Sequence, residues 1–497
     1  MNIELQVIGS ALRAVAEEMG AALVRSAFSA NIKERRDCST ALFDSDGRMI
    51  AQAEHIPVHL GAMPDAVAAV MAHDPGAHDV WILNDPFTGG THLPDITLVS
   101  RTALGFAATR AHHADVGGSE PGSLPADSTT LADEGVVIPP TRLDDDVLAQ
   151  LVSRMRNPEE RRGDLRAQLA AHHLAARRIA ELCARRGHER VATAMDELYA
   201  YSERRVRAAI GALPDGCFEA TDVLEANEGD LELRATLTIA AEEIEIDFAG
   251  TAPQHAGNLN CPLAVTRSAA YFVVRCVTDP DVPASGGAFA PVAVTAPEGS
   301  LLNARPPAAV AAGNVETSCR IADLLFACFA QAVPVPSQGQ GTMNNVTFGN
   351  DRFTYYETIG GGQGACPGAD GPSGVHVTMS NTLSTPTEAL ELAYPLRIRR
   401  HALRLGSGGD GTHRGGDGVI REIEALEPCH FSVVSERRRH SPEGVEGGDP
   451  GQPGHNLLNG EERAGKISGD LARGDVLTVE TPGGGGYAHP GSYGEKA

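Results

Sequence analysis

The chain has 497 residues, of which 42% are hydrophobic and 21% are charged, and its formal charge is −24 at neutral pH. This length exceeds the size at which a single core stops growing, so two or three domains are expected. The acidic charge argues against a nucleic-acid-binding role, because phosphate recognition needs a broad basic surface. Glycine is abundant at 55 residues, which predicts many tight loops.

The cysteines and the start of the chain bear on its compartment. The nine cysteines form no CxxC pair, so neither a zinc ribbon nor a dithiol redox motif is expected, and the scatter is typical of reduced thiols. The first twenty residues have neither the basic start nor the apolar run of a secretory signal. No stretch approaches the roughly 20 apolar residues of a membrane span. A cytoplasmic protein that makes no use of a membrane is therefore expected.

The first part of the chain is predicted to combine helices with short strands. Apolar residues recur every three or four positions from Leu5 to Leu23, which predicts an amphipathic helix. Two short extended runs around the turn at residues 44–47 predict a hairpin. The other elements expected in this part are a helix over 63–71, strands over 80–83, 96–100 and 106–110, a loop over 119–142, and mainly helical chain over 146–211.

The second part is predicted to be richer in strands. Apolar and polar residues alternate over residues 242–248, which predicts an antiparallel strand with one wet face, and residues 218–226 and 231–239 behave alike. Helices are expected over 266–277 and 316–332, and glycine-rich, strand-like chain follows residue 339. The fold class predicted is α+β, a mixed multi-domain protein with antiparallel sheets and a helical segment in the N-terminal half. The domains expected are a metal-site domain with a helical segment over 1–211, a central mixed sheet domain over 212–400, and a glycine-rich, mainly β region over 401–497.

The densest polar stretch is the loop from Asn84 to Asp95, in which prolines and glycines exclude a helix. His92 and Asp95 are three residues apart, and in a tight turn their side chains can converge. An imidazole with a carboxylate suits Zn²⁺, Mn²⁺ or Fe²⁺. For this pair alone the commoner explanation is a solvent loop in which aspartates make turns.

A second cluster, His112 and His113, ends a predicted strand. Strand alternation sends the two side chains to opposite faces, so at most one of them enters a given site. Either cluster alone is explained by an exposed turn or by surface histidines at a strand end. Two such clusters on consecutive strands together indicate a shared metal site. Asp37, which follows a run of charged residues, could add an oxygen ligand, or it could belong to a charged helix end followed by a cap.

Other features carry less weight. His55 and His59 flank Pro57 and could line a pocket, although such histidines are commonly loop residues. The glycine run over residues 360–364 could cradle a phosphate through backbone N–H groups. It lacks the lysine of a P-loop and the strand–GxGxxG–helix context, so nucleotide binding is only weakly indicated. The chain has no GxSxG elbow, and nucleophilic catalysis is therefore not favoured.

Six separated motifs, in the same order, resemble the hydantoinase B / 5-oxoprolinase family, which also includes relatives of the acetone carboxylase alpha subunit. The resemblance runs from near residue 5 to near residue 490. The motifs are Ser29–Ser39, Asn84–Asp95, Ala111–Gly118, Gly313–Ser318, Ser435–Arg439 and Gly483–Tyr487.

The resemblance implies a role as one subunit of a hetero-oligomer. A hydantoinase A-type partner would bind ATP and phosphorylate the carbonyl oxygen of a small-molecule substrate, and the B-type subunit would carry a divalent metal (Zn, Mn or Fe). The implied activity is ATP-dependent hydrolysis of a cyclic amide of the hydantoin or 5-oxoproline type. One alternative is a subunit of an ATP-dependent ketone carboxylase of the acetone or acetophenone type. A second is a non-catalytic scaffold for the ATP-binding partner.

The resemblance also assigns residues. The implied metal ligands are Asp37, His92, Asp95 and one histidine of the 112–113 pair, with His112 favoured because it stands three before Asp115 in an H-x-x-D-x-G-G pattern. Asp115 would be an outer carboxylate that orients a ligand imidazole. Asp115 and His113 are both candidate catalytic bases, and this choice stays open. A basic entrance for an anionic intermediate is expected from Arg35, Arg36 or the arginines at 437–439.

Overall fold

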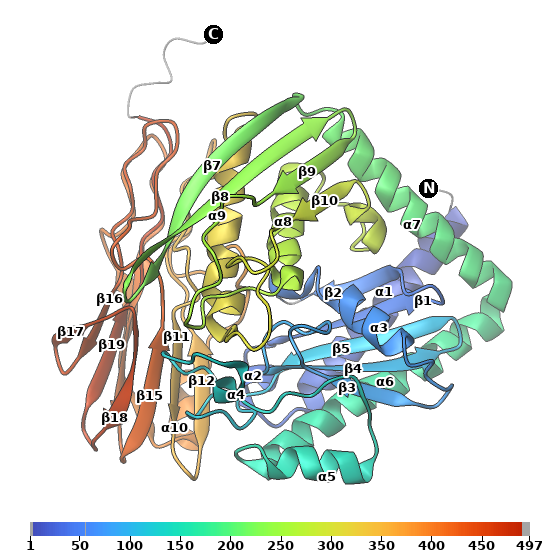
Figure 1. Cartoon of the computed structure of the whole chain (residues 1–497), viewed down its shortest axis with the longest axis horizontal. Helices are drawn as coiled ribbons and strands as arrows, with labels where there is room; N and C mark the ends of the chain where they lie inside the picture. The colour runs from blue at the N-terminus through green and yellow to red at the C-terminus, as the bar shows by residue number, and fades with distance from the viewer. Residues whose placement is uncertain (1–2, 55, 490–497) are drawn as a thin grey trace.

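The predicted amphipathic helix is the first element of the computed structural model, which describes residues 3–54 and 56–489 (Figure 1). This helix, α1 (Ile3–Ser26), buries one stripe of apolar side chains that includes Leu5, Ile8 and Leu12. The other helices described are α2 (Ala30–Lys33), α3 (Met63–Met71), α4 (Leu131–Glu134), α5 (Asp145–Ser153), α6 (Pro158–Arg186), α7 (His188–Ile210), α8 (Leu263–Val277), α9 (Ser318–Phe329) and α10 (Thr387–Ala393).

The first sheet contains the strands predicted in residues 39–110 and one short strand outside that range. Its order is β2-β1-β5-β4-β3-β6 and every neighbouring pair is antiparallel. Helices α1, α6 and α7 pack against it and share an apolar core with β1 and β5. Its strands are β1 (Cys38–Asp44), β2 (Met49–Glu54), β3 (Val80–Leu83), β4 (Asp95–Thr102), β5 (Gly105–His112) and β6 (Thr141–Arg142). The predicted loop over 119–142 is wrong in part, because it contains α4 and ends in β6.

A second sheet, of order β10-β9-β8-β7, follows α7. The alternating burial of β8 confirms the predicted wet face, and a parallel partner, β10, joins β9 at its outer edge. Helices α8 and α9 pack together inside this region, within the largest apolar core. The strands are β7 (Gly216–Ala226), β8 (Gly229–Ala240), β9 (Glu243–Asp247) and β10 (Val292–Thr295). The expected helix over 316–332 is α9, and the π-helical turn η3 (Gly313–Thr317) precedes it.

Two further sheets pack face to face near the C-terminal end, at the left of Figure 1. Their orders are β12-β11-β15-β18 and β13-β14-β19-β16-β17. Their strands are β11 (Asn345–Gly349), β12 (Thr354–Thr358), β13 (Leu396–Arg404), β14 (Gly418–Ala425), β15 (Cys429–Val434), β16 (His455–Leu458), β17 (Glu461–Arg463), β18 (Lys466–Leu471) and β19 (Val476–Glu480). The α+β class is therefore confirmed, while the division at residues 212 and 400 stays a prediction.

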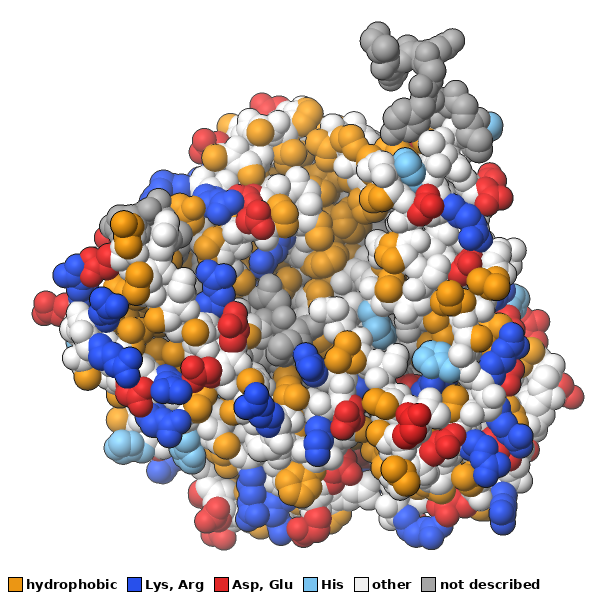
Figure 2. Space-filling model, turned by 180° about the vertical axis from the view of Figure 1, so that it is seen from behind, with side chains coloured by type: hydrophobic (Ala, Val, Ile, Leu, Met, Phe, Trp, Pro, Cys, Tyr) orange, Lys and Arg blue, Asp and Glu red, His pale blue; other side chains and the backbone are white. Residues whose placement is uncertain are grey.

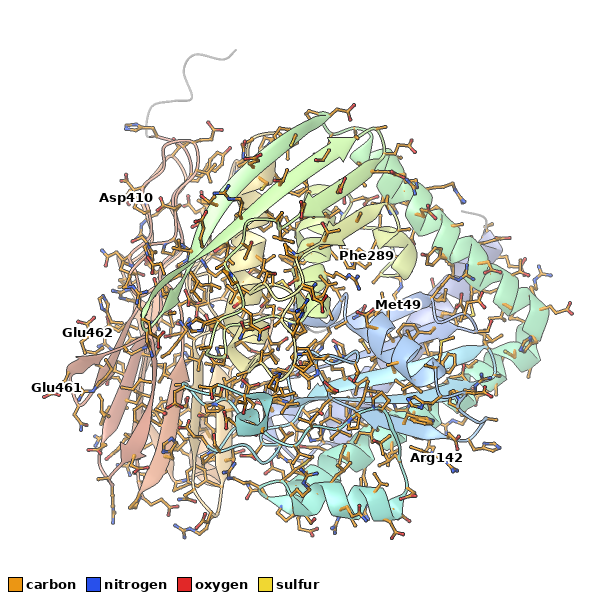
Figure 3. All side chains as sticks on the ribbon, viewed as in Figure 1. Met49, Arg142, Phe289, Asp410, Glu461 and Glu462 are labelled. Atoms are coloured by element: carbon orange, nitrogen blue, oxygen red, sulfur yellow. The ribbon has the colours of Figure 1, made fainter. Side chains whose placement is uncertain are left out.

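Glycine-rich segments beside these sheets pack backbone against backbone, and we call residues 337–340, 360–364, 407–418, 442–452 and 482–488 the glycine bundle. Gly484 donates its N–H to the Gly416 carbonyl at 2.9 Å, and Gly416 donates to the Gln363 carbonyl at 2.9 Å. A Cβ on Gly484 would lie 2.1 Å from the Gln363 oxygen. In Figure 3 the label Asp410 marks this bundle, and Glu461 and Glu462 mark β17 below it.

The glycine run over residues 360–364 thus has a packing role. The N–H groups of Gly361, Gly362 and Gln363 donate to the backbone carbonyls of Val375, Pro482 and Pro372. Those three groups are not free to cradle a phosphate, so the weak nucleotide hypothesis for this run is not supported.

The face turned away from Figure 1 is hollowed, and hydrophobic side chains gather in the upper part of that hollow (Figure 2). Within residues 3–54 and 56–489, no helix combines the length and the apolar character needed to cross a membrane.

Candidate metal centre

Three of the predicted ligands lie at one end of the first sheet because of strand register. Asp95 begins β4 and pairs directly with His112, which ends β5. Asp37 immediately precedes β1, and its carbonyl accepts the His112 N–H at 3.0 Å. The register of two antiparallel pairs therefore brings residues far apart in sequence to one place.

The fourth predicted ligand, His92, is placed by the shaped loop before β4. The buried Asn84 side chain anchors this loop: its amide donates to the Leu93 and Val136 carbonyls, and its oxygen accepts the Ile138 N–H. The chain folds back so tightly at Gly90 that a Cβ there would lie 2.3 Å from the Asn84 carbonyl oxygen.

Three ligand atoms converge on one point. His92 Nε2 lies 3.2 Å from Asp95 Oδ1 and 3.2 Å from His112 Nδ1, and the third side of this triangle, from His112 Nδ1 to Asp95 Oδ1, is 3.4 Å. Ligand atoms at about 2.1 Å from a tetrahedral ion stand about 3.4 Å apart. Asp37 Oδ2 is close by, 4.0 Å from His112 Nδ1. Two imidazoles and one carboxylate therefore have the spacing of a divalent-cation site, and Asp37 lies beside this group.

The other oxygen of Asp95 is held by residues outside this triangle. Asp95 Oδ2 accepts a 2.6 Å hydrogen bond from Thr91 Oγ1 and lies 3.4 Å from His59 Nε2, whose Nδ1 contacts Ser39 Oγ at 2.9 Å. These contacts direct Oδ1 inward, as outer partners of metal ligands do. The sequence marks His59 only as a pocket or loop residue, and its neighbour in that argument, His55, lies outside the described residues.

Burial shapes the electrostatics of the cluster. All four side chains are almost fully buried. Burial and then the nearby Asp95 charge raise the pKa of Asp37 to about 7, whereas burial lowers the pKa of His112 to about 4. Burial also opposes the charge of Asp95, but His92 and His59 hold its pKa well below the usual range. The site thus concentrates charge that a cation would balance.

Strand alternation separates His112 from His113, as predicted. His112 faces the cluster, and His113 Nε2 lies 3.0 Å from Gln168 Oε1 on α6. Asp115 is also engaged elsewhere: its carboxylate accepts the N–H groups of Gly117 and Gly122 and pairs with Arg156. The structure therefore brings together His92, Asp95 and His112 with Asp37 beside them, and it leaves His113 and Asp115 outside that group. The role of Asp37 as a fourth ligand stays a prediction.

The arginines expected at an entrance lie in different surroundings. Arg35 is fully buried and bonds Asn31, Thr358, Thr382 and the Tyr356 carbonyl. Arg36 is exposed beside it. The segment 437–439 lies against Glu225, Asp230 and Asp323. The basic entrance stays a prediction.

A sequence model described as Hydantoinase B/oxoprolinase matches residues 1–490. The chain belongs to the hydantoinase B/oxoprolinase family. Family membership confirms the resemblance carried by the six motifs, two of which, Asn84–Asp95 and Ala111–Gly118, supply three of the four clustered side chains.

Individual relatives cover nearly the whole chain. The 5-oxoprolinase 1 of Arabidopsis thaliana is 37% identical over an alignment 529 positions long, which covers 98% of this chain and 42% of that protein. The chain thus spans less than half the length of that relative. A protein of Pseudomonas sp., whose name describes a B-type component of a D-/L-hydantoinase, is 30% identical over 98% of this chain and 90% of its own length.

Two solved structures are similar to this chain. The ATP-dependent caprolactamase of Pseudomonas jessenii has a TM-score of 0.91 and 27% identity, over 98% of this chain and 91% of that chain. A nucleotide-free acetone carboxylase has a TM-score of 0.87 and 18% identity, over 97% of this chain and 75% of that chain, which is a likeness of fold.

Proposed function

We propose that this chain is the metal-dependent subunit of an ATP-dependent enzyme that hydrolyses a cyclic amide. The names of two relatives, a 5-oxoprolinase and a caprolactamase, both refer to cyclic amides. The single observation that carries the metal is the buried triangle of His92 Nε2, Asp95 Oδ1 and His112 Nδ1. We assign His92, Asp95 and His112 as ligands and Asp37 as the fourth.

ATP is assigned to a hydantoinase A-type partner. The sequence has no P-loop, and one relative is named as the B-type component of a hydantoinase. An unstrained lactam is a poor electrophile, and its carbonyl oxygen becomes a good leaving group once the partner has phosphorylated it. The assembled enzyme would therefore be a hetero-oligomer in which this chain completes the reaction.

The residues of this chain would prepare the site. When bound, a divalent cation polarises a substrate oxygen as a Lewis acid and makes water more acidic. Thr91 and His59 direct the inner oxygen of Asp95, and the surrounding burial keeps bulk water away from the ligands. Asp115, bonded to Gly117, Gly122 and Arg156, would order the loop after β5, and its catalytic role and that of His113 stay predictions.

Metal analysis tests this proposal directly. The wild-type chain, purified without chelator, is expected to hold about one divalent ion, and His92→Ala is expected to hold none. His173→Ala, at an exposed position on α6, is the matched control and should keep the metal. A wild-type chain without metal, together with unchanged activity of His92→Ala, would leave the scaffold alternative as the better explanation.

A carboxylase is the second candidate, favoured by the fold that the chain shares with acetone carboxylase. The co-expressed pair should be assayed with hydantoin, with 5-oxoproline, and with acetone plus bicarbonate. Hydrolysis predicts ATP turnover that depends on a cyclic amide. Turnover that responds only to a ketone plus bicarbonate would overturn the hydrolase proposal.

A further inference from the structure

Two of the six motifs, Gly313–Ser318 and Ser435–Arg439, supply no ligand to the metal centre, yet they meet beside it. They converge on the buried pair Asn344 and Asn345 at the start of β11. Arg438 Nη2 donates to Asn344 Oδ1 at 2.9 Å, and Asn345 Nδ2 donates to Glu316 Oε1 at 2.7 Å. Each motif therefore holds one of two adjacent asparagines.

The amide of Asn345 has its orientation fixed from both ends. Its nitrogen donates to Glu316 Oε1 and, at 2.9 Å, to the Val434 carbonyl, and both partners are acceptors. Its oxygen consequently faces the other way, where it accepts a 2.8 Å hydrogen bond from Tyr356 Oη. Glu316 thereby determines where the Tyr356 hydroxyl is held.

Tyr356 in turn lies flat against a predicted metal ligand. Its ring is parallel to the His112 imidazole, with centroids 4.6 Å apart and planes at 8°. A metal-ligating histidine usually has its ring fixed by a hydrogen bond from its other nitrogen. His112 Nε2 is buried and has no such partner among the described residues. The stacked phenol ring instead contacts the face of the imidazole.

We infer that Glu316, Asn345 and Tyr356 are positioning residues that hold the His112 imidazole in its ligating orientation. This inference rests on the proposed metal centre. Tyr356 comes from β12, so part of the C-terminal half of the chain would set the geometry of ligands supplied by the N-terminal sheet.

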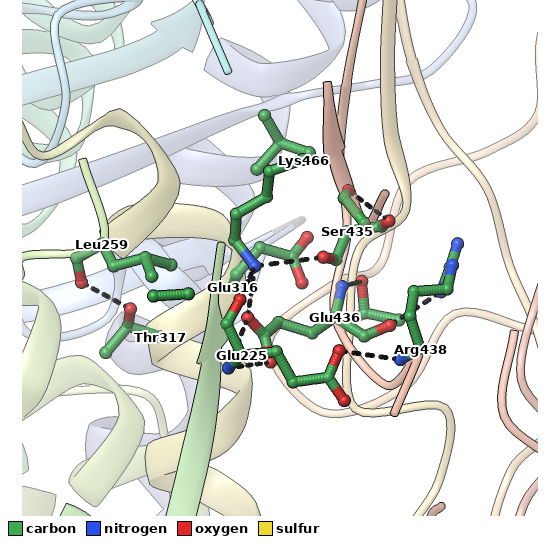
Figure 4. A network of polar contacts seen from close by, with 12 residues as sticks. Glu225, Leu259, Glu316, Thr317, Ser435, Glu436, Arg438 and Lys466 are labelled. Carbon is green, nitrogen blue, oxygen red and sulfur yellow. Dashed lines mark hydrogen bonds and ion pairs between the residues drawn. The ribbon is translucent and has the colours of Figure 1, made fainter. Parts of the chain in front are cut away.

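Arg438, which holds the neighbouring Asn344, belongs to a buried polar network (Figure 4). Lys466 Nζ donates to Glu436 Oε1 at 2.5 Å and to the carbonyls of Glu225 and Ser435. The Glu225 carboxylate accepts the N–H of Arg438 at 2.9 Å.

Glu316 lies in the π-helical turn η3, and insertions of this kind occur frequently at functional sites. Burial raises the pKa of Glu316 to about 8, so a glutamine there imitates its neutral form.

The neighbouring tyrosine provides a matched control. Tyr355 is also buried and in β12, but it points into the core between the two C-terminal sheets and its hydroxyl donates to Glu357 at 2.9 Å. Tyr356→Phe and Tyr355→Phe each remove one buried phenol hydroxyl. Only the first should disturb His112.

The test is a competition titration of the purified full chain with Zn²⁺ against a chromophoric chelator, together with the visible spectrum of the Co²⁺-loaded chain. We expect Tyr356→Phe and Glu316→Leu each to weaken Zn²⁺ binding by about 10-fold or more, as loss of an outer partner does, and to alter the Co²⁺ spectrum. Tyr355→Phe and Glu316→Gln should stay within about 3-fold of wild type and keep the spectrum. The double variant Tyr356→Phe with Glu316→Leu should weaken Zn²⁺ binding by less than the product of the two single fold-changes, because both substitutions act on the same contacts.

The outcomes separate the two proposals. Equal effects of Tyr356→Phe and Tyr355→Phe, with a wild type that binds Zn²⁺ tightly, would overturn the positioning role and leave the metal centre intact. A wild type that binds no divalent ion would overturn the metal centre, and the positioning role with it. A weakening confined to Tyr356→Phe, Glu316→Leu and their combination supports both.

Discussion

The metal centre and the glycine bundle use opposite means to bring distant parts of the chain together. In the metal centre, imidazole and carboxylate side chains reach within 3.2–3.4 Å of one another at a sheet end. In the bundle, the absence of side chains lets backbones approach so closely that a Cβ on Gly415 would lie 1.9 Å from the Gly484 oxygen. The first region gathers polar side chains, and the second gathers main-chain hydrogen bonds.

Because the two regions use different contacts, substitutions can affect function and stability separately. The ligand side chains are buried charges that oppose folding unless they are paired, so their removal should cost binding more than stability. The bundle glycines contact no predicted ligand, so their replacement should cost stability first. Substitutions in the metal centre should therefore lower metal binding with little loss of stability, and substitutions in the glycine bundle should lower stability first.

The largest loss of function is expected at Asp95. Asp95→Asn keeps the side-chain volume but removes the charge that faces both imidazoles. We expect Zn²⁺ retention to be lost and the activity of the assembled pair to fall by more than the roughly 100-fold that an outer partner can cost, as read by metal analysis and a coupled ATP assay. Asp44→Asn, at the other end of β1, is the control and should keep its metal; loss of metal there as well would show a general effect of burying an amide.

The largest loss of stability is expected at Gly484. In Gly484→Ala the new methyl group would lie 2.1 Å from the Gln363 carbonyl oxygen, which only a backbone shift can relieve. The unfolding free energy should fall by at least about 4 kcal/mol, the range reserved for severe packing defects, measured by denaturant titration. Gly469→Ala, whose Cβ would meet an ordinary 3.4 Å contact, should cost less than about 1 kcal/mol. Similar costs at both positions would contradict the close-packing account.

Glu316, which bonds Asn345 behind the metal centre, should make stability depend on pH. Because burial raises its pKa from 4.5 to about 8, it holds a proton in the folded chain that the unfolded chain releases above pH 4.5. Raising the pH across this window therefore lowers wild-type stability by about 1.4 kcal/mol per pH unit through this group. Glu316→Gln lacks this dependence, so its stability relative to wild type should rise with pH in denaturant titrations from pH 5.5 to 7.5. A constant difference across that range would show that Glu316 ionises normally.

The smallest effect is expected at His113. Its ring is turned towards Gln168 on α6, so His113→Gln should leave Zn²⁺ affinity within about 2-fold of wild type, whereas His112→Gln removes a ligand. The same competition titration compares both variants. A larger loss of Zn²⁺ affinity in His113→Gln than in His112→Gln would identify His113 as the ligand instead of His112.

Sequence reasoning finds what residue type and local spacing encode. His92, Asp95 and the 112–113 pair stand out because histidine and aspartate cluster at the ends of predicted strands, and alternation distinguishes His112 from His113. Asp37 needs the family resemblance, since its local pattern also fits a helix end. Strands β1 to β5 of the first sheet are predicted to within a few residues for the same local reasons, whereas β6, only two residues long, is missed.

The remainder depends on contacts that no local pattern carries. Tyr356 lies more than 200 residues from His112, and nothing in its strand marks it as a neighbour of an imidazole. The glycine run at 360–364 predicts loops, but its partners are other glycine segments known only from the fold. The π-helical turn at η3 has the same apolar spacing as an ordinary helix start, so the sequence does not distinguish the two.

The position of the last glycine segment has a consequence for synthesis. Residues 482–488 bond to segments around 363, 409, 416, 445 and 452, so the bundle cannot close until the ribosome has passed residue 488. The first sheet, complete by residue 142, is exposed to the cell long before then. A nascent chain would therefore display its histidines and aspartates for tens of seconds, at about 5–20 residues per second, before the tyrosine that steadies one of them has docked. The proposed ligands are thus assembled during synthesis before the residues proposed to position them.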